Sequence, residues 1–172
     1  AVLGASGSGK SSVLRAGIIP ALADGAVAGS DAWPVVLMTP GTDPVGELAY
    51  QLRRVGEANG VSPGDLTGDD PQPWRLTADA ICDATGGLVI CVDQFEELFT
   101  HDATGHEATR FLDALTSIVD PERSRVRLVF AMRADFYGDA ARSPWLTGIL
   151  NRNQMLVGPM APDELRRAVI GP

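Results

Sequence analysis

The chain has 172 residues, of which 45% are hydrophobic and 21% are charged, so we expect one well-buried domain. Its formal net charge of −8 argues against the broad basic face of a nucleic-acid-binding protein, and no apolar run of 18 or more residues is present to cross a membrane. Cys82 and Cys91 are too few and too unpatterned for a disulfide framework or a zinc site, which favours a cytoplasmic location. From the acidic charge and the missing apolar run we expect no direct contact with nucleic acid or with a membrane.

Strands and helices are expected to alternate along the chain. In order, the patterns predict a strand at 1–3, a helix at 10–22, a strand at 33–39, a helix at 45–55, a flexible connection at 56–73, a helix at 74–84, a strand at 88–92, a helix that ends at Asp120-Pro121, a strand at 126–132 and a short strand at 154–157. Asp43 is expected to cap the second helix, and Thr104 with Glu107 to form a capping box. This order is typical of an α/β fold with a parallel sheet and helices on both faces.

A phosphate-binding loop is predicted directly after the first strand. The run Gly4-Ala5-Ser6-Gly7-Ser8-Gly9-Lys10-Ser11 matches the pattern G-x-x-x-x-G-K-[ST], in which backbone N–H groups surround a phosphate at a helix N-terminus. Lys10 would neutralise the β- and γ-phosphates, and the Ser11 hydroxyl would bind Mg²⁺. The predicted nucleotide-binding residues are Gly4, Ser6, Gly7, Ser8, Gly9, Lys10, Ser11 and Ser12. The alternative is a Gly/Ser-rich turn that only caps a helix.

Lys10 is the only lysine in the chain, whereas the other thirteen basic residues are arginines. A compact ammonium group suits the phosphates of a nucleotide better than a planar guanidinium does. The choice of residue at this position therefore supports the phosphate-binding interpretation.

Acidic residues follow the buried strand 88–92. Asp93 is expected to hold Mg²⁺ through water molecules together with Ser11, although an aspartate at a strand end also often caps a helix. Of Glu96 and Glu97, one is expected to polarise the attacking water, and Glu96 is the favoured candidate. The other would cap a helix or form a surface pair.

Arg133 follows the strand 126–132 at the carboxyl edge of the sheet, where open parallel sheets bind ligands. A cation at this edge could sense the γ-phosphate, and the alternative is an ion pair with Asp135. Arg123, Arg125 and Arg127 alternate at the opposite edge and are expected to form a solvated face.

Four separated blocks of the sequence resemble the bacterial STAND-type NTPases of the novel STAND 1 group, which are related to the AAA+ and NACHT NTPases. They read GASGSGKSSVLRAGIIPAL, VIC-VDQFEELFT, FAMRADFYG and VGPMAPDELRRAVIGP. The resemblance implies a P-loop NTPase three-layer sandwich whose five parallel strands have the order 5-1-4-3-2. It also implies ATP or ADP with Mg²⁺ as ligands, and a slow ATPase that switches a larger signalling or regulatory protein.

The same resemblance implies a division of the chain and further partners. Residues 1–158 would form the nucleotide-binding core with a truncated first strand, and residues 159–172 the start of a helical lid. Sensor and effector domains would belong to the same larger chain, which would form a homo-oligomer on activation. Gln94 departs from the STAND branches that place an acid directly after the Asp, whereas Arg133 matches the family's sensor position.

Other P-loop proteins fit the sequence less well. No signature of the ABC ATPases precedes the acidic strand, and the N-K-x-D motif of GTPases is impossible with a single lysine. A small-molecule kinase would need an arginine-rich lid, whereas residues 56–73 contain no basic residue. A non-hydrolysing scaffold that retains its nucleotide stays open as an alternative of a different class.

Overall fold

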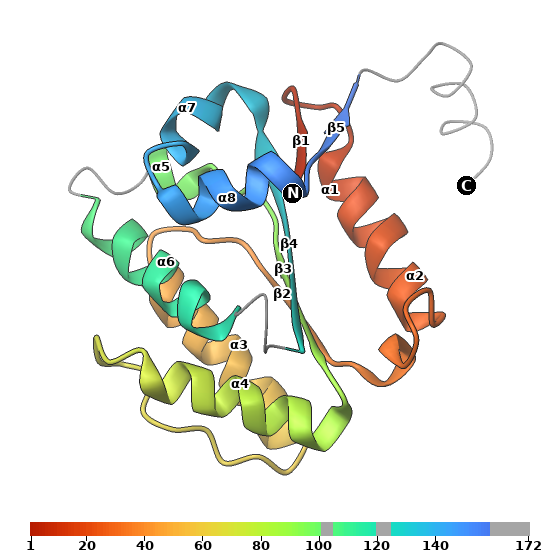
Figure 1. Ribbon diagram of the computed structural model, residues 1–172, viewed down its shortest axis with the longest axis vertical. Coiled ribbons are helices and arrows are strands. Elements are labelled where there is room, and N and C mark those ends of the chain that lie inside the picture. The colour runs from red at the N-terminus through yellow and green to blue at the C-terminus, as the bar shows by residue number, and fades with distance from the viewer. Residues whose placement is uncertain (101–104, 120–124, 159–172) are drawn as a thin grey trace.

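The computed structural model describes residues 1–100, 105–119 and 125–158 of the chain. Its five strands form one parallel sheet in the order β2-β3-β4-β1-β5, which confirms the predicted order read from the other edge (Figure 1). The strands are β1 Val2–Gly4, β2 Val35–Met38, β3 Leu88–Val92, β4 Val126–Arg133 and β5 Met155–Val157. β3 is buried along its whole length, as expected for a strand covered on both faces.

Helices cover the two faces of the sheet, which Figure 1 shows nearly edge-on. One face carries the continuous helical segment α1 Lys10–Ser12, η1 Val13–Ile18 and α2 Ile19–Ala23, and the other carries α3 Pro44–Ala58, α4 Gln72–Thr85 and α6 His106–Ile118. Shorter helices complete the described part of the chain: η2 Ser30–Ala32, α5 Glu97–Thr100, η3 Ala134–Phe136, α7 Tyr137–Ala140 and α8 Pro144–Arg152. The predicted three-layer arrangement is therefore present.

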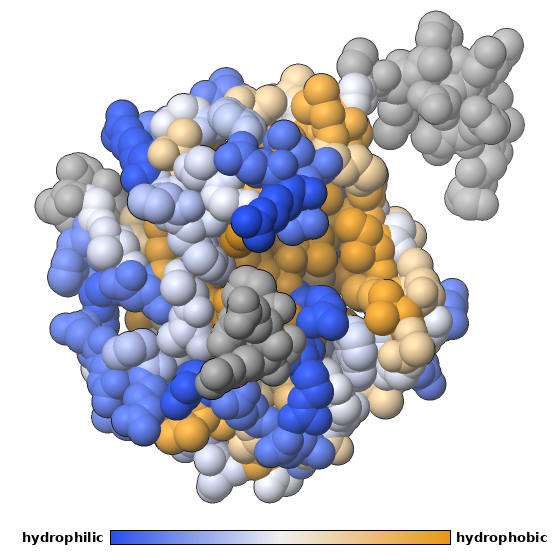
Figure 2. All heavy atoms as spheres, viewed as in Figure 1, coloured by the Kyte–Doolittle hydropathy of each residue, from blue (hydrophilic) through white to orange (hydrophobic). Residues whose placement is uncertain are grey.

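The two faces of the sheet are covered to different extents. The larger apolar cluster lies on the side of α3, α4 and α6, where the rings of Phe95 and Phe130 are 4.5 Å apart. The smaller cluster lies under η1 and α2, and many of the hydrophobic residues packed against it are only partly buried. Figure 2 shows apolar side chains gathered on the surface beside α2. None of the helices in the described residues is long and apolar enough to span a membrane.

The predicted helix at 10–22 is present, but its middle, η1, is a π-helix. Pro20 explains the wider turn, because its ring has no N–H to donate and would collide with the carbonyl four residues earlier in an α-helix. The Ile19 N–H donates instead to the carbonyl of Leu14, five residues earlier.

The prediction missed α8 and is only partly tested at α6. Ser143 begins α8 by accepting a hydrogen bond from the Leu146 N–H, and Pro144 occupies its first turn, which is a helix signal that the sequence contained. Gly105 is the N-cap of α6, without a side-chain cap, while Thr104, Asp120-Pro121 and residues 159–172 lie outside the described residues.

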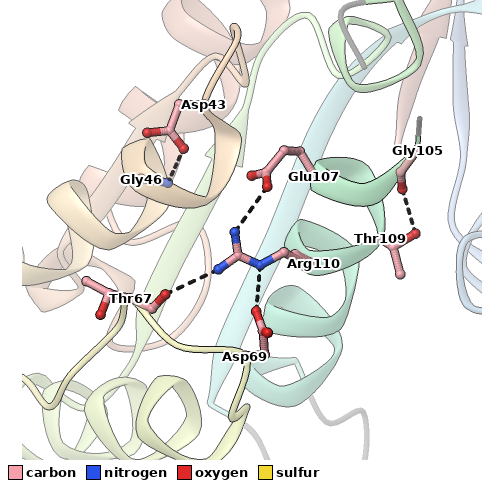
Figure 3. Close-up of polar contacts among 8 residues, drawn as sticks. All are labelled: Asp43, Gly46, Thr67, Asp69, Gly105, Glu107, Thr109 and Arg110. Atoms are coloured by element: carbon pink, nitrogen blue, oxygen red, sulfur yellow. Dashed lines mark hydrogen bonds and ion pairs between the residues drawn. The ribbon is translucent and has the colours of Figure 1, made fainter. Parts of the chain in front are cut away.

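The connection at 56–73 was expected to be flexible, and the structure corrects this expectation. Its first residues belong to α3 and its last to α4, and Leu66 between them is fully buried. Arg110 on α6 holds the connection by donating to the Asp69 carboxylate and to the Thr67 carbonyl (Figure 3). The same guanidinium pairs with Glu107, the residue expected to complete the capping box.

Candidate functional site

The glycine-containing loop between β1 and α1 has the backbone of a phosphate-binding loop. Gly7 and Gly9 have φ values of +73° and +92°, which favour glycine over any residue with a Cβ. Gly4 is required for a different reason, since a Cβ there would come within 2.5 Å of the Val157 carbonyl oxygen on β5. Ser6 in this loop and Ser12 at the end of α1 are both exposed.

Lys10 is almost fully buried, at 9% exposure, and its side chain lies back over the loop. The Nζ atom donates a hydrogen bond of 2.7 Å to the Ala5 carbonyl, so the ammonium group is fixed inside the turn that the glycines create. A buried lysine charge held by the carbonyl of such a loop is suited to an anionic ligand.

Asp93 directly follows β3. Its side chain connects this strand to α1 and η1, the helical segment that follows the glycine-containing loop. The side chain is 3% exposed. Oδ1 accepts hydrogen bonds from the Ser11 hydroxyl at 2.8 Å and from the Gln94 N–H at 3.0 Å, and Oδ2 accepts one from the Arg15 guanidinium at 3.0 Å. The structure therefore brings together the two residues predicted to bind Mg²⁺, from positions 82 residues apart.

The side chains at this point fit a magnesium ion bound together with a nucleotide. Mg²⁺ in NTPases takes one hydroxyl and one carboxylate from the protein and its remaining ligands from phosphates and water, and Ser11 and Asp93 supply that pair. The described residues contain no group of three or more His, Cys, Asp or Glu side chains that could hold a metal ion alone. The Ser8 hydroxyl adds a buried oxygen that makes no hydrogen bond within the described part of the chain.

The two glutamates after Asp93 point to different strands. Glu96 accepts a hydrogen bond of 3.1 Å from the backbone N–H of Arg133, which pairs in register with Gly4 of the phosphate loop. Glu97 accepts one of 3.0 Å from the Gly41 N–H, which follows β2 at the far edge of the sheet. Glu96 is therefore the glutamate on the side of the phosphate loop.

Arg133 forms the ion pair that was the alternative to a sensor role. Its Nε atom is 3.1 Å from Oδ1 of Asp135, Nη2 contacts the second oxygen, and the guanidinium lies 5.4 Å from the ring centroid of Phe136. The hydrogen bond from Arg133 holds the pKa of Asp135 below its usual range, and the same contact raises the pKa of Arg133. The proposed sensor role stays a prediction.

The arginines of the opposite edge are exposed, as expected, at the two positions that the structure describes, Arg125 and Arg127. Arg125 forms an ion pair with Asp83, and the Arg127 guanidinium lies 5.9 Å from the ring centroid of Trp33. Arg123 lies outside the described residues. This edge is thus partly tied to neighbouring side chains.

Sequence reasoning missed two features of the site. Arg15 follows Ser11 by four residues, about one helical turn, and this spacing could have indicated that both face Asp93. Gln94 has a φ of +52°, the one positive value among the described non-glycine residues. Such a backbone is strained in a residue with a Cβ, and strain of this kind concentrates at functional sites.

Cys91 lies two residues before Asp93 but is not a candidate nucleophile. Its side chain is fully buried in β3, and burial raises the pKa of its thiol to about 12. The thiolate, which is the reactive form, is therefore not populated at neutral pH.

Comparison with known proteins identifies the family and the fold. The sequence model of the family described as "Novel STAND NTPase 1" matches residues 1–172. Among solved structures, the ORC2 protein of Aeropyrum pernix, in ADPNP–ADP complexes, is similar with a TM-score of 0.59 at 12% sequence identity. The similarity covers 98% of this chain and 43% of the ORC2 chain, and at this identity it shows the fold alone. A search of the curated proteins finds no match.

Proposed function

This chain belongs to the novel STAND NTPase 1 family, and from that premise we propose that it binds MgATP and hydrolyses it slowly as the switch of a larger protein. The observation that carries the proposal is the contact between Ser11 and Asp93 beside the buried Lys10. A mere helix-capping turn would not need a buried ammonium group and a buried carboxylate at the same edge of the sheet. The ADPNP and ADP in the ORC2 complexes are in keeping with an adenine nucleotide as ligand.

We assign the phosphates to the loop from Gly4 to Ser12 and the metal to Ser11 and Asp93. Backbone N–H groups and Lys10 would hold the β- and γ-phosphates. Mg²⁺, when bound, would neutralise charge on the phosphate oxygens during transfer to water. Asp93 is suited to orient water molecules around the ion because its Oδ1 is fixed by neighbouring donors.

We propose Glu96 as the residue that polarises the attacking water. Its carboxylate is bonded to the backbone beside Gly4, whereas Glu97 is bonded to the loop after β2, two strands away from β4. Glu97 would then hold the β2–α3 connection in place and would affect hydrolysis only indirectly, through the position of that connection. Arg133 would leave Asp135 to contact the γ-phosphate, which its half-exposed side chain permits.

The first test is nucleotide binding by the Lys10→Ala variant. We expect at least about a 100-fold loss of ATP affinity, because the one cation of the loop would be removed from a site that binds several negative charges. Titration with a fluorescent ATP analogue measures the loss, and Arg142→Ala on the surface is the matched control. Binding that survives Lys10→Ala would contradict the proposal.

The second test separates the glutamates by phosphate release. Glu96→Gln should lower the single-turnover rate of hydrolysis by about 100-fold while leaving ATP affinity within about threefold, since a general base acts mainly in the chemical step. Glu97→Gln should have a smaller effect, and the exposed Glu57→Gln none. If both Glu96→Gln and Glu97→Gln kept the wild-type rate, the proposed base would be wrong, and a wild-type protein that releases no phosphate would make the non-hydrolysing scaffold the better description.

The wider role of the domain is also part of the proposal. Sensor and effector domains of the same chain, a helical lid from residue 159, homo-oligomerisation on activation and a cytoplasmic location all follow from the resemblance to STAND switches. Phosphate transfer from ATP to an added small molecule would instead favour the P-loop kinase.

A further inference from the structure

We propose that Arg15 competes with Mg²⁺ for Asp93 and thereby sets the magnesium concentration at which the site binds nucleotide. The inference rests on the proposed function, because it concerns the same carboxylate. It adds a residue outside the phosphate-loop motif and gives that residue a regulatory task.

The burial of Asp93 is the first step. A carboxylate on a side chain with 3% exposure has lost nearly all of its water, and its charge must be balanced by a cation or by several donors. Arg15 is the cation that forms an ion pair with it, at 3.0 Å. The ammonium group of Lys10 is directed to the Ala5 carbonyl instead, so the two cations near the loop have separate partners.

The exposure of Arg15 is the second step. Its side chain is 50% exposed, whereas that of Asp93 is 3% exposed. A guanidinium that is already half in water loses little hydration when it leaves the pair and gains back rotamer freedom. Arg15 is therefore able to depart, while Asp93 is fixed.

The positions of the carboxylate oxygens supply the third step. Oδ1 contacts Ser11, the other predicted magnesium ligand, and Oδ2 contacts Arg15. A divalent ion bound between Ser11 and Asp93 would stand a few ångströms from the guanidinium and repel it. Binding of MgATP and departure of Arg15 are thus coupled, and the return of Arg15 would assist the release of magnesium with ADP.

The experiment measures the affinity of a fluorescent ADP analogue at increasing Mg²⁺ concentration for wild type and Arg15→Gln. Arg15→Gln should lower the half-saturating Mg²⁺ concentration about tenfold, because removal of a unit charge near a divalent ion has an effect of this size even in a water-like dielectric. In EDTA the same variant should melt about 5 °C below wild type, because the buried Asp93 charge loses its counter-ion. This difference should shrink in saturating MgADP.

Two further variants make the result specific. Arg15→Lys retains a positive charge and should restore most of the wild-type Mg²⁺ dependence, whereas Arg142→Gln removes a surface arginine paired with Asp139 and should change neither quantity. An unchanged Mg²⁺ midpoint in Arg15→Gln, or nucleotide binding by wild type that does not depend on Mg²⁺, would overturn the proposal. Lys10→Ala tests the proposed function separately, because it removes a residue of the phosphate loop and not of the Arg15–Asp93 pair. The melting difference in EDTA tests that pair without nucleotide, so it does not depend on the proposed function.

Discussion

Two arginines in this molecule hold aspartates in nearly identical hydrogen bonds but in opposite surroundings. Arg15 donates to Asp93 at 3.0 Å and Arg110 donates to Asp69 at 2.7 Å. The side chain of Asp93 is 3% exposed and that of Asp69 is 80% exposed. In the first pair the acid is buried and the arginine is half in water, whereas in the second the acid is the exposed partner.

The difference shows that burial of the aspartate, rather than the length of the hydrogen bond, decides the role of each ion pair and of the side chains around it. An exposed ion pair in water contributes little on its own, so Arg110 matters through the number of its contacts, which reach Glu107, Asp69 and the Thr67 carbonyl. A buried carboxylate must always have a partner. Asp93 therefore suits a site where one cation replaces another.

The largest expected effect comes from neutralising each aspartate in turn. Asp93→Asn should weaken Mg²⁺-dependent nucleotide binding by about 10–100-fold, the usual loss when a residue that orients metal-bound water is changed. Isothermal titration calorimetry at fixed Mg²⁺ measures this loss. Asp69→Asn is the matched control and should leave nucleotide affinity unchanged, because Asp69 is exposed and pairs with Arg110 on α6 rather than with a residue of the candidate site (Figure 3).

An effect of Asp69→Asn on nucleotide affinity comparable with that of Asp93→Asn would contradict the expectation that only the buried ion pair belongs to the nucleotide site. It would mean that the two clusters are coupled through the body of the domain. The free energy of unfolding should also distinguish the two variants, because Asp69→Asn should change it by less than about 1 kcal/mol.

A smaller effect is expected when the exposed cluster loses its arginine. Arg110→Ala removes the contacts that tie the connection between α3 and α4 to α6, and it should lower the free energy of unfolding by about 1 kcal/mol. Hydrogen exchange should become faster around Thr67 and Leu66, while nucleotide binding stays at the wild-type level. Unchanged exchange in this segment would show that burial of Leu66 alone holds the connection.

The smallest effect concerns Asp135, whose pair with Arg133 is exposed but lies at the same edge as the phosphate loop. The pKa of Asp135 is lowered by the hydrogen bond from Arg133, so the pair stabilises the fold above the ordinary aspartate pKa of about 3.9 and loses this contribution as the pH falls through the lowered value. A carboxyl NMR titration should give a midpoint below the ordinary one. Arg133→Gln should return it to normal.

The same titration also tests the sensor role of Arg133. If the guanidinium moves to the γ-phosphate, MgATP should raise the pKa of Asp135 toward its ordinary value, whereas MgADP should not. A pKa that does not respond to ATP would leave Arg133 as a structural residue.

Much of the fold was predictable because its signals are local. The apolar run at 88–92 and the periodicity at 45–55 each reflect burial within one element, and the sheet order followed from the family resemblance. The π-turn of η1 was not predicted, because it depends on how Pro20 is accommodated in a helix that packing requires to continue.

The site was predictable to the extent that motifs specify it. The motif gave Lys10 and Ser11, and the strand pattern gave Asp93, but the separation of Glu96 from Glu97 depends on which neighbouring backbone each carboxylate meets. Glu96 meets the backbone of β4, and Glu97 meets the loop after β2, far from both glutamates in the sequence. Arg15 illustrates the same limit, since its partner lies 78 residues away.

The place of β1 in the sheet has a consequence for the order of folding. β1 is made before its two neighbours in the sheet, β4 and β5, and the Ala1 carbonyl accepts its hydrogen bond from Met155. Contacts across such sequence separations form slowly, because a long loop must close before they contribute. The phosphate loop thus leaves the ribosome long before the strands that support it. A nascent chain that ends before β4 should bind no nucleotide, so the proposed nucleotide site is complete only once β4 and β5 have been made.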